Sequence, residues 1–185
     1  GLGDVYKRQI VDETADIADA AAKIAASKTF DNATSCSSEN AVIAVDAVYD
    51  ELVAALAAEG GYCLDAAQTA NLEGIHWHNG KLTSKLLAKD IDVVLAETGF
   101  AGTAPDNTSF LVAPQDEFGP DHPMTGEKMS RFLALHRAGD FDEAMEKAVA
   151  IQNHMGAGHS LSLHSADDGR ARRLAMEART CRVIV

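Results

Sequence analysis

Apolar positions along the chain follow two periods, and the segments that carry them alternate. Residues 16–30 place alanine and isoleucine at three- and four-residue spacing, which predicts an amphipathic helix with Thr14 or Asp16 as N-cap. Residues 41–45, Ala-Val-Ile-Ala-Val, form the continuous apolar run typical of a strand buried on both faces. The same patterns predict helices at 47–58, 65–73, 84–97, 141–154 and 167–178, and strands at 109–113, 131–136, 160–164 and 182–185.

This alternation predicts an α/β fold, a mostly parallel sheet flanked by helices on both faces. Gly60 and Gly61 are expected to end the helix at 47–58, and Pro114 the strand at 109–113. Residues 114–126 hold three of the four prolines and are expected to form an ordered loop. Because no internal repeat or linker interrupts the pattern, one compact domain is expected.

Both ends of the chain have the character of a cut. Residues 4–9, Asp-Val-Tyr-Lys-Arg-Gln, are identical to a read-through translation of a common sequencing adapter. We therefore expect residues 1–9 to be a non-native leader. Residues 181–185 predict a strand with no turn after it, so residues 10–185 are expected to be a domain truncated at both ends, from a longer protein.

Composition and charge narrow the class of protein. Hydrophobic residues make up 46% and charged residues 24%, close to the average for globular domains. The net charge of -12 argues against nucleic acid and against an anionic membrane surface, since both require a positive patch. No apolar run reaches 18 residues, and the three cysteines contain no C-x-x-C pair, which favours a cytoplasmic protein with reduced thiols.

The decapeptide 31–40, Asp-Asn-Ala-Thr-Ser-Cys-Ser-Ser-Glu-Asn, carries the most chemistry. Small polar residues around Cys36 would let backbone N–H groups approach the sulfur and an oxyanion formed beside it. The residues alone leave two interpretations, a nucleophilic thiol and an ordinary small loop residue. Composition favours the second, because a lone cysteine is weak support for catalysis.

Resemblance to a known family reverses that preference. Residues 12–17 (DETADI), residues 27–32 (SKTFDN), Cys36 and residues 38–40 (SEN) resemble the aldehyde dehydrogenase superfamily. The CoA-acylating branch, in which the nucleophile follows Phe-Asp-Asn, is the nearer likeness, and its sulfoacetaldehyde dehydrogenases share the wording of residues 32–40. The resemblance covers nearly all of residues 10–185 and implies the catalytic-domain fold of that superfamily.

The resemblance also implies a reaction, the oxidation of a small aldehyde such as sulfoacetaldehyde to an acyl-CoA. Cys36 would be the nucleophile and would carry the acyl group as a thioester. NAD or NADP would be the cofactor and coenzyme A the co-substrate. Asn32 is expected to line the active site, and the full-length protein is expected to be a homo-oligomer.

A second motif lies at residues 127–131, Glu-Lys-Met-Ser-Arg. It resembles the Glu-Lys-Leu-Ser-Pro of the acylating branch, in which the glutamate holds the nicotinamide ribose, with Arg131 in place of proline. Residues 117–120 (EFGP) resemble the more widespread Glu-x-Phe-Gly-Pro version but lack its spacer residue. Glu127 is therefore the candidate cofactor-binding residue, and the alternative is a solvated loop carboxylate.

Two further residues are candidates to line the active site. His159 follows Gly158 as in the Gly-His-Thr of the acylating branch, although the glycines here also suit a helix C-cap and a tight turn. Arg182 would suit an anionic substrate or the phosphates of coenzyme A, against the alternative of a solvated arginine. No metal site is expected, because the histidines lack H-E-x-x-H spacing.

Two rival functions remain at this point. A hydrolytic aldehyde dehydrogenase would release the free acid, and only the wording around Cys36 separates it from an acylating enzyme. The isolated chain is expected to be an inert α/β module, because the dinucleotide-binding half of the family lies outside it.

Overall fold

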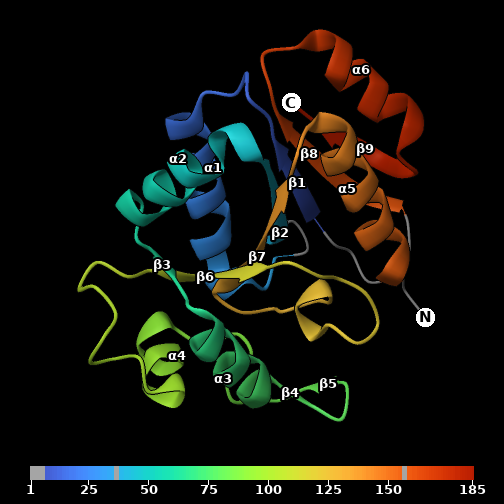
Figure 1. The fold of residues 1–185 in the computed structure, drawn as a ribbon. Coiled ribbons are helices and arrows are strands. Elements are labelled where there is room, and N and C mark those ends of the chain that lie inside the picture. The colour runs from blue at the N-terminus through green and yellow to red at the C-terminus, as the bar shows by residue number, and fades with distance from the viewer. Residues whose placement is uncertain (1–6, 36–37, 156–157) are drawn as a thin grey trace.

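The computed structural model describes residues 7–35, 38–155 and 158–185 (Figure 1). The amino-terminal half contains β1 Lys7–Val11, α1 Ile17–Thr29, the 3₁₀ helix η1 Phe30–Ala33, β2 Glu39–Val45, α2 Asp46–Ala58, β3 Gly61–Cys63, α3 Ala66–His76, β4 Trp77–His78 and β5 Lys81–Leu82. The remainder contains α4 Ile91–Thr98, β6 Phe110–Gln115, the 3₁₀ helix η2 Pro123–Thr125, β7 Phe132–Ala138, α5 Phe141–Met155, β8 Gly158–His164, α6 Asp168–Glu177 and β9 Thr180–Ile184.

Seven of these strands form one sheet in the order β3-β6-β7-β2-β1-β8-β9, and each neighbouring pair is parallel. The two remaining described strands, β4 and β5, form a separate antiparallel hairpin. The predicted α/β class with a mostly parallel sheet is thus confirmed. Figure 1 shows α1 and α2 on one side of the sheet and α5 on the other.

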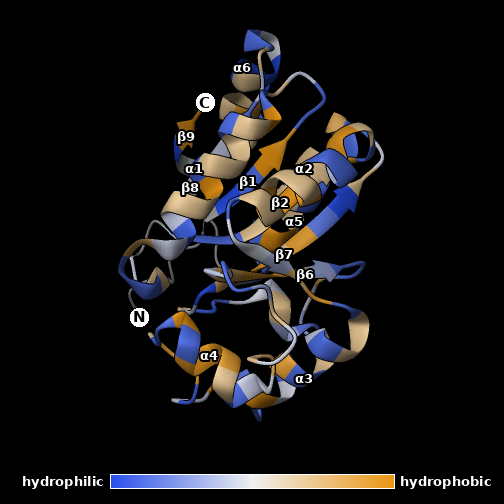
Figure 2. Ribbon diagram, turned by 90° about the vertical axis from the view of Figure 1, so that its left-hand side faces the viewer, coloured by the Kyte–Doolittle hydropathy of each residue, from blue (hydrophilic) through white to orange (hydrophobic). Residues whose placement is uncertain are grey.

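Successive side chains along a strand point to opposite faces of the sheet, so they can belong to different hydrophobic clusters. In β7, Leu133 and Leu135 belong to the cluster that includes α1, α2 and α5, whereas Phe132 and Ala134 belong to a second cluster with α3 and α4. Every residue of β2 is buried, as the apolar run predicted. Figure 2 shows both hydrophobic and hydrophilic colours along the helices, as amphipathic helices require.

Some predicted boundaries are wrong. The strand expected to end before Pro114 continues to Gln115, because β3 pairs only as far as Val112 and Pro114 has a strand neighbour on one side alone. The helix expected over 84–97 begins at Ile91, since Ala88 adopts a left-handed φ of 55°.

Four strands were not predicted at all. The hairpin β4–β5 turns at Asn79 and Gly80, whose φ values of 50° and 72° suit a tight hairpin turn. That dipeptide was a signal available in the sequence. β3 is a strand of three residues, too short to show a period.

The fourth unpredicted strand, β1, includes part of the expected leader. It pairs with β2 and β8 in the middle of the sheet, and the side chains of Arg8 and Gln9 are buried. The non-native origin of residues 1–9 stays a prediction, since a strand position says nothing about where a sequence came from. Among the described residues, no helix combines the length and the apolar character that crossing a bilayer needs.

Candidate active site

Three of the predicted site residues stand in the sequence shortly before a strand of the sheet or at its start. Cys36 precedes β2 in the sequence, Glu127 precedes β7, and His159 is the second residue of β8. Because the strands are parallel, their amino ends meet at the same edge, and β7, β2, β1 and β8 are consecutive there. Cys36 lies outside the described residues, and His159 is described only as backbone of β8.

Two hydrogen bonds connect residues 31–40, the segment that contains Cys36 and is called the cysteine loop below, to residues 127–131, called the Glu127 motif. Before the cysteine, Asn32 Oδ1 accepts from Arg131 Nε at 2.7 Å. After it, Asn40 Oδ1 accepts from the backbone N–H of Lys128 at 3.2 Å. The residues on either side of Cys36 are thus fastened to the motif that carries Glu127. Arg131, which stands where the acylating branch has proline, is the donor in one of these two hydrogen bonds.

Both of the segments that these hydrogen bonds connect contain residues with strained backbone conformations. Asp31, Asn32 and Ala33 adopt φ values of 48°, 50° and 59°, and Met129 adopts 44°. Left-handed backbone costs an L-residue about 1–2 kcal/mol, less for Asn and Asp, whose side chains bond locally. Such strain concentrates at functional sites, where the surrounding structure enforces it.

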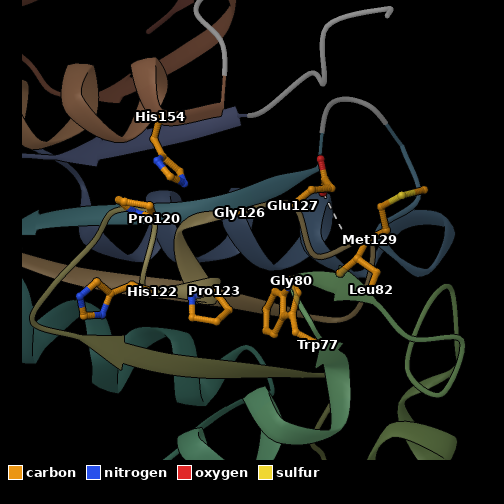
Figure 3. Close-up of a pocket in the computed structure, with 10 residues that line it drawn as sticks. All are labelled: Trp77, Gly80, Leu82, Pro120, His122, Pro123, Gly126, Glu127, Met129 and His154. Atoms are coloured by element: carbon orange, nitrogen blue, oxygen red, sulfur yellow. Dashed lines mark hydrogen bonds between the residues drawn. The ribbon is translucent and has the colours of Figure 1, made fainter.

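Glu127 lines a pocket of about 330 Å³. Figure 3 shows its walls, which come from the hairpin β4–β5, the loop before β7 and the end of α5. The lining residues are Trp77, Gly80, Leu82, Pro120, His122, Pro123, Gly126, Glu127, Met129 and His154. The pocket therefore combines aromatic and apolar walls with one carboxylate and two imidazoles.

The carboxylate of Glu127 is half-buried and oriented by backbone groups. Its Oε1 accepts from the N–H groups of Lys128 and Met129 at 3.0 and 3.2 Å. Within the described part of the chain, Oε2 makes no hydrogen bond. One oxygen is thus fixed by the turn and the other is available to a hydroxyl group in the pocket.

Two buried lysines lie next to these segments, and sequence reasoning missed both. Lys28 is 1% exposed and donates to the carbonyl of Glu39 at 2.8 Å, and Lys128 is fully buried. Burial lowers the pKa of Lys28 to about 8, although Glu127 and Glu39 act in the opposite direction. Each lysine stands inside a motif already noticed, but a sequence pattern does not show that an amine is enclosed.

His76 closes the site from the side of α3. Burial lowers its pKa to about 4, so the ring is neutral at pH 7. Its Nε2 contacts the carbonyl of Lys128 at 2.7 Å and must carry the proton, because a carbonyl only accepts. The ring also packs edge-on against Trp77 and Phe132.

The other candidates lie apart from the pocket. Asn32 donates to Asp90 Oδ1 at 2.9 Å and accepts from Arg131, so both ends of its amide are engaged. Arg182 is exposed on β9 and is not among the residues that line the Glu127 pocket. No group of three or more His, Cys, Asp or Glu side chains suited to a metal ion occurs among the described residues.

Known proteins resemble the chain over its whole length. It is 42% identical over 185 residues to an acylating sulfoacetaldehyde dehydrogenase of Cupriavidus necator, and 32% identical over 188 residues to the bifunctional aldehyde-alcohol dehydrogenase AdhE of Escherichia coli K12. An acetylating aldehyde dehydrogenase from Geobacillus thermoglucosidasius superposes with a TM-score of 0.94 at 30% identity, over all of this chain. The chain is thus similar, over its whole length, to one region of these dehydrogenases.

This region is a minor part of each relative. The chain spans 38% of the C. necator protein, 21% of AdhE and 40% of the G. thermoglucosidasius chain. A propionaldehyde dehydrogenase from Clostridium phytofermentans also matches, with a TM-score of 0.90 and 30% identity, and the chain covers 41% of it. No protein-family model matches the chain. The likenesses confirm the predicted resemblance to acylating aldehyde dehydrogenases and the fold that it implied.

Proposed function

We propose that the full-length protein oxidises a small aldehyde to its acyl-CoA, with NAD or NADP as oxidant and Cys36 as nucleophile. The observation that carries the proposal is the pair of hydrogen bonds that joins the cysteine loop to the Glu127 motif on both sides of Cys36. The 42% identity to an acylating sulfoacetaldehyde dehydrogenase favours sulfoacetaldehyde as the aldehyde.

In this proposal, the Cys36 thiolate adds to the carbonyl carbon of the aldehyde. Loss of hydride from the carbon of this thiohemiacetal would leave the acyl group on Cys36 as a thioester, and a bound nicotinamide would supply the hydride acceptor. The thiol of coenzyme A would then take the acyl group and lose its proton to solvent, which would release the Cys36 thiolate. When bound, NAD(P) thus supplies the hydride acceptor and coenzyme A the acyl acceptor.

The residues of the pocket fit this cofactor. A ribose offers two neighbouring hydroxyl donors, and an ionised carboxylate accepts from both. Glu127 has one oxygen oriented by two backbone N–H groups and lines a pocket of about 330 Å³. We assign Glu127 to the nicotinamide ribose. Trp77 and Met129 provide the apolar walls against which the sugar and ring would pack.

The remaining assignments belong to the same proposal. Asn32 and His159 would line the active site, and Arg182 would meet an anionic group of the substrate or of coenzyme A. Residues 10–185 would be part of the catalytic domain, with residues 1–9 a leader. The full-length protein would be a cytoplasmic homo-oligomer.

Product analysis of the full-length enzyme with sulfoacetaldehyde tests the reaction. We expect one reduced dinucleotide and one acyl-CoA per aldehyde, and no turnover when coenzyme A is omitted. Free acid formed without coenzyme A would show a hydrolytic enzyme and contradict acyl transfer. Cys36→Ala should abolish turnover while leaving the circular dichroism spectrum unchanged, since the substitution removes a single sulfur atom. Surviving activity in this variant would mean that Cys36 is not the nucleophile.

A further inference from the structure

The side chain of Lys128 makes an unusual set of contacts for an amine. It is fully buried, and Nζ donates to the carbonyl oxygens of Met124 and Gly126 at 2.6 and 3.0 Å. Both acceptors belong to the turn that leads into Glu127. The long side chain therefore folds back onto its own loop and closes it into a ring.

The backbone of Lys128 is engaged as well. Its N–H is shared between Asn40 Oδ1 at 3.2 Å and Glu127 Oε1 at 3.0 Å. Its carbonyl accepts from His76 Nε2 at 2.7 Å. One residue thus links the Glu127 turn to the start of β2, just after the cysteine loop, and to the end of α3.

The amine forms this ring without a carboxylate partner. No ion pair of Lys128 occurs among the described residues, so the charge of a buried ammonium would be costly there. Burial, and then the neighbouring charge of Lys28, hold the pKa of Lys128 well below its ordinary value. Glu127 and Glu73 act in the opposite direction. Neutral or charged, the amine has the two N–H donors that the two carbonyls require. The burial of Lys128 is therefore not explained by a stabilising ion pair. It is explained by the two hydrogen bonds that its amine makes to the turn.

The turn needs such a hold because it is strained. Met129, which directly follows Lys128, has a φ of 44°, and its N–H is one of the two that orient Glu127. If the 124–126 carbonyls were released, the turn could relax and carry the carboxylate of Glu127 away from the pocket. A displacement of about 1 Å at a binding group is enough to weaken its function strongly.

We propose that Lys128 is a positioning residue, which holds the 124–129 turn closed so that the carboxylate of Glu127 faces the pocket where the dinucleotide binds. The inference rests on the proposed function in one respect, the assignment of Glu127 to the nicotinamide ribose. Lys128 itself touches neither cofactor nor substrate, so its removal should weaken cofactor binding and leave the chemical step largely intact.

The test compares two lysines, each of which donates to a backbone carbonyl, in the full-length enzyme. Lys128→Met keeps the apolar stem and removes the two hydrogen bonds, and it should raise the KM for the dinucleotide about tenfold or more, with kcat at saturation changed less than about threefold. Lys147→Met is the matched control, because it removes an amine that donates to the backbone carbonyl of Arg137 at the opposite edge of the sheet and not to the turn. It should change that KM less than about twofold. Glu127→Gln should raise the KM in the same way as Lys128→Met.

A second variant keeps the proposal open to refutation if Lys128→Met fails to fold. Asn40→Ala removes the acceptor that ties the Lys128 N–H to β2, and it should raise the same KM by about threefold. An unchanged KM in folded Lys128→Met or in Asn40→Ala would overturn the proposal. An equal rise in Lys147→Met, or no rise in Glu127→Gln, would do the same. Should the product prove to be free acid, acyl transfer fails but the KM comparison still decides the role of Lys128.

Discussion

The two edges of the sheet differ in how charged side chains are paired and in where strained backbone occurs. At the carboxyl edge, acidic side chains meet arginines: Asp12, which follows β1, pairs with Arg170 at 2.8 Å, and Arg137 near the end of β7 pairs with Asp46 and Asp50. At the amino edge, the buried amines of Lys28 and Lys128 donate to backbone carbonyl groups, and residues with left-handed backbone lie beside them in the sequence.

This difference distinguishes the carboxyl edge, where the contacts stabilise the fold, from the amino edge, where we propose the active site. Ion pairs and helix caps at the carboxyl edge are arrangements that any stable α/β domain can use. Unpaired buried amines and left-handed residues reduce stability and persist where function requires them. Ligands of open α/β sheets usually bind at the carboxyl edge, so the placement of this candidate site at the amino edge departs from that rule.

The largest predicted effect concerns the amino edge in alkaline solution. The pKa of Lys28 is about 8 in the folded chain against 10.5 ordinarily, so between these pH values the unfolded state binds more protons. The free energy of unfolding should therefore rise from pH 8 to pH 10.5, with up to about 3 kcal/mol of the rise due to Lys28. Urea denaturation at several pH values should show a smaller rise in Lys28→Met. Lys23→Met, an exposed lysine on the same helix, is the control, and parallel curves for all three proteins would contradict the prediction.

The carboxyl edge should respond to acid instead. Burial alone would raise the pKa of Asp12, but hydrogen bonds from Ser165, Arg170 and Thr14 together bring it below its ordinary value. Arg170→Ala leaves this fully buried carboxylate without its cation, and should lower the free energy of unfolding at pH 7 by about 2 kcal/mol.

The sign of the pH dependence checks the cause. Because the folded pKa of Asp12 is lowered, its contribution is present above 3.8 and is lost as the pH falls through the folded value. The gap between wild type and Arg170→Ala, measured by urea denaturation, should close over that range. Arg173→Ala removes an arginine that pairs with exposed Asp142 and Glu177, and a loss as large as that of Arg170→Ala would refute the interpretation.

The smallest effect tests the strain at the amino edge. Ala88 is exposed, has a φ of 55° and donates its N–H to the carbonyl of Met129. Ala88→Gly should raise the melting temperature, with a gain of about 1 kcal/mol, because glycine adopts this backbone without a steric penalty. Ala26→Gly, at an exposed position of α1, should lower stability by about the same amount. A loss in both variants would mean that Ala88 is not strained.

Local pattern predicted most of the elements. The helix at 16–30 and the strand at 41–45 follow from periodicity that neighbouring residues impose on one another, and the structure has them at Ile17–Thr29 and Glu39–Val45. Motif wording pointed to Cys36 and Glu127, and the structure places Glu127 in a pocket. Periodicity failed where an element is too short to show one, as in β3 and the hairpin β4–β5.

The sequence by itself determined the α/β class, the family resemblance and the two motifs, since each depends on residues close together in the chain. Only the tertiary structure decided the strand order and the contacts that unite the motifs. The Asn32–Arg131 and Asn40–Lys128 hydrogen bonds join residues 99 and 88 positions apart. The burial of Lys28 and Lys128 was likewise decided by packing. A lysine is ordinarily solvated, and only the elements folded over it determine whether its amine finds water or a carbonyl.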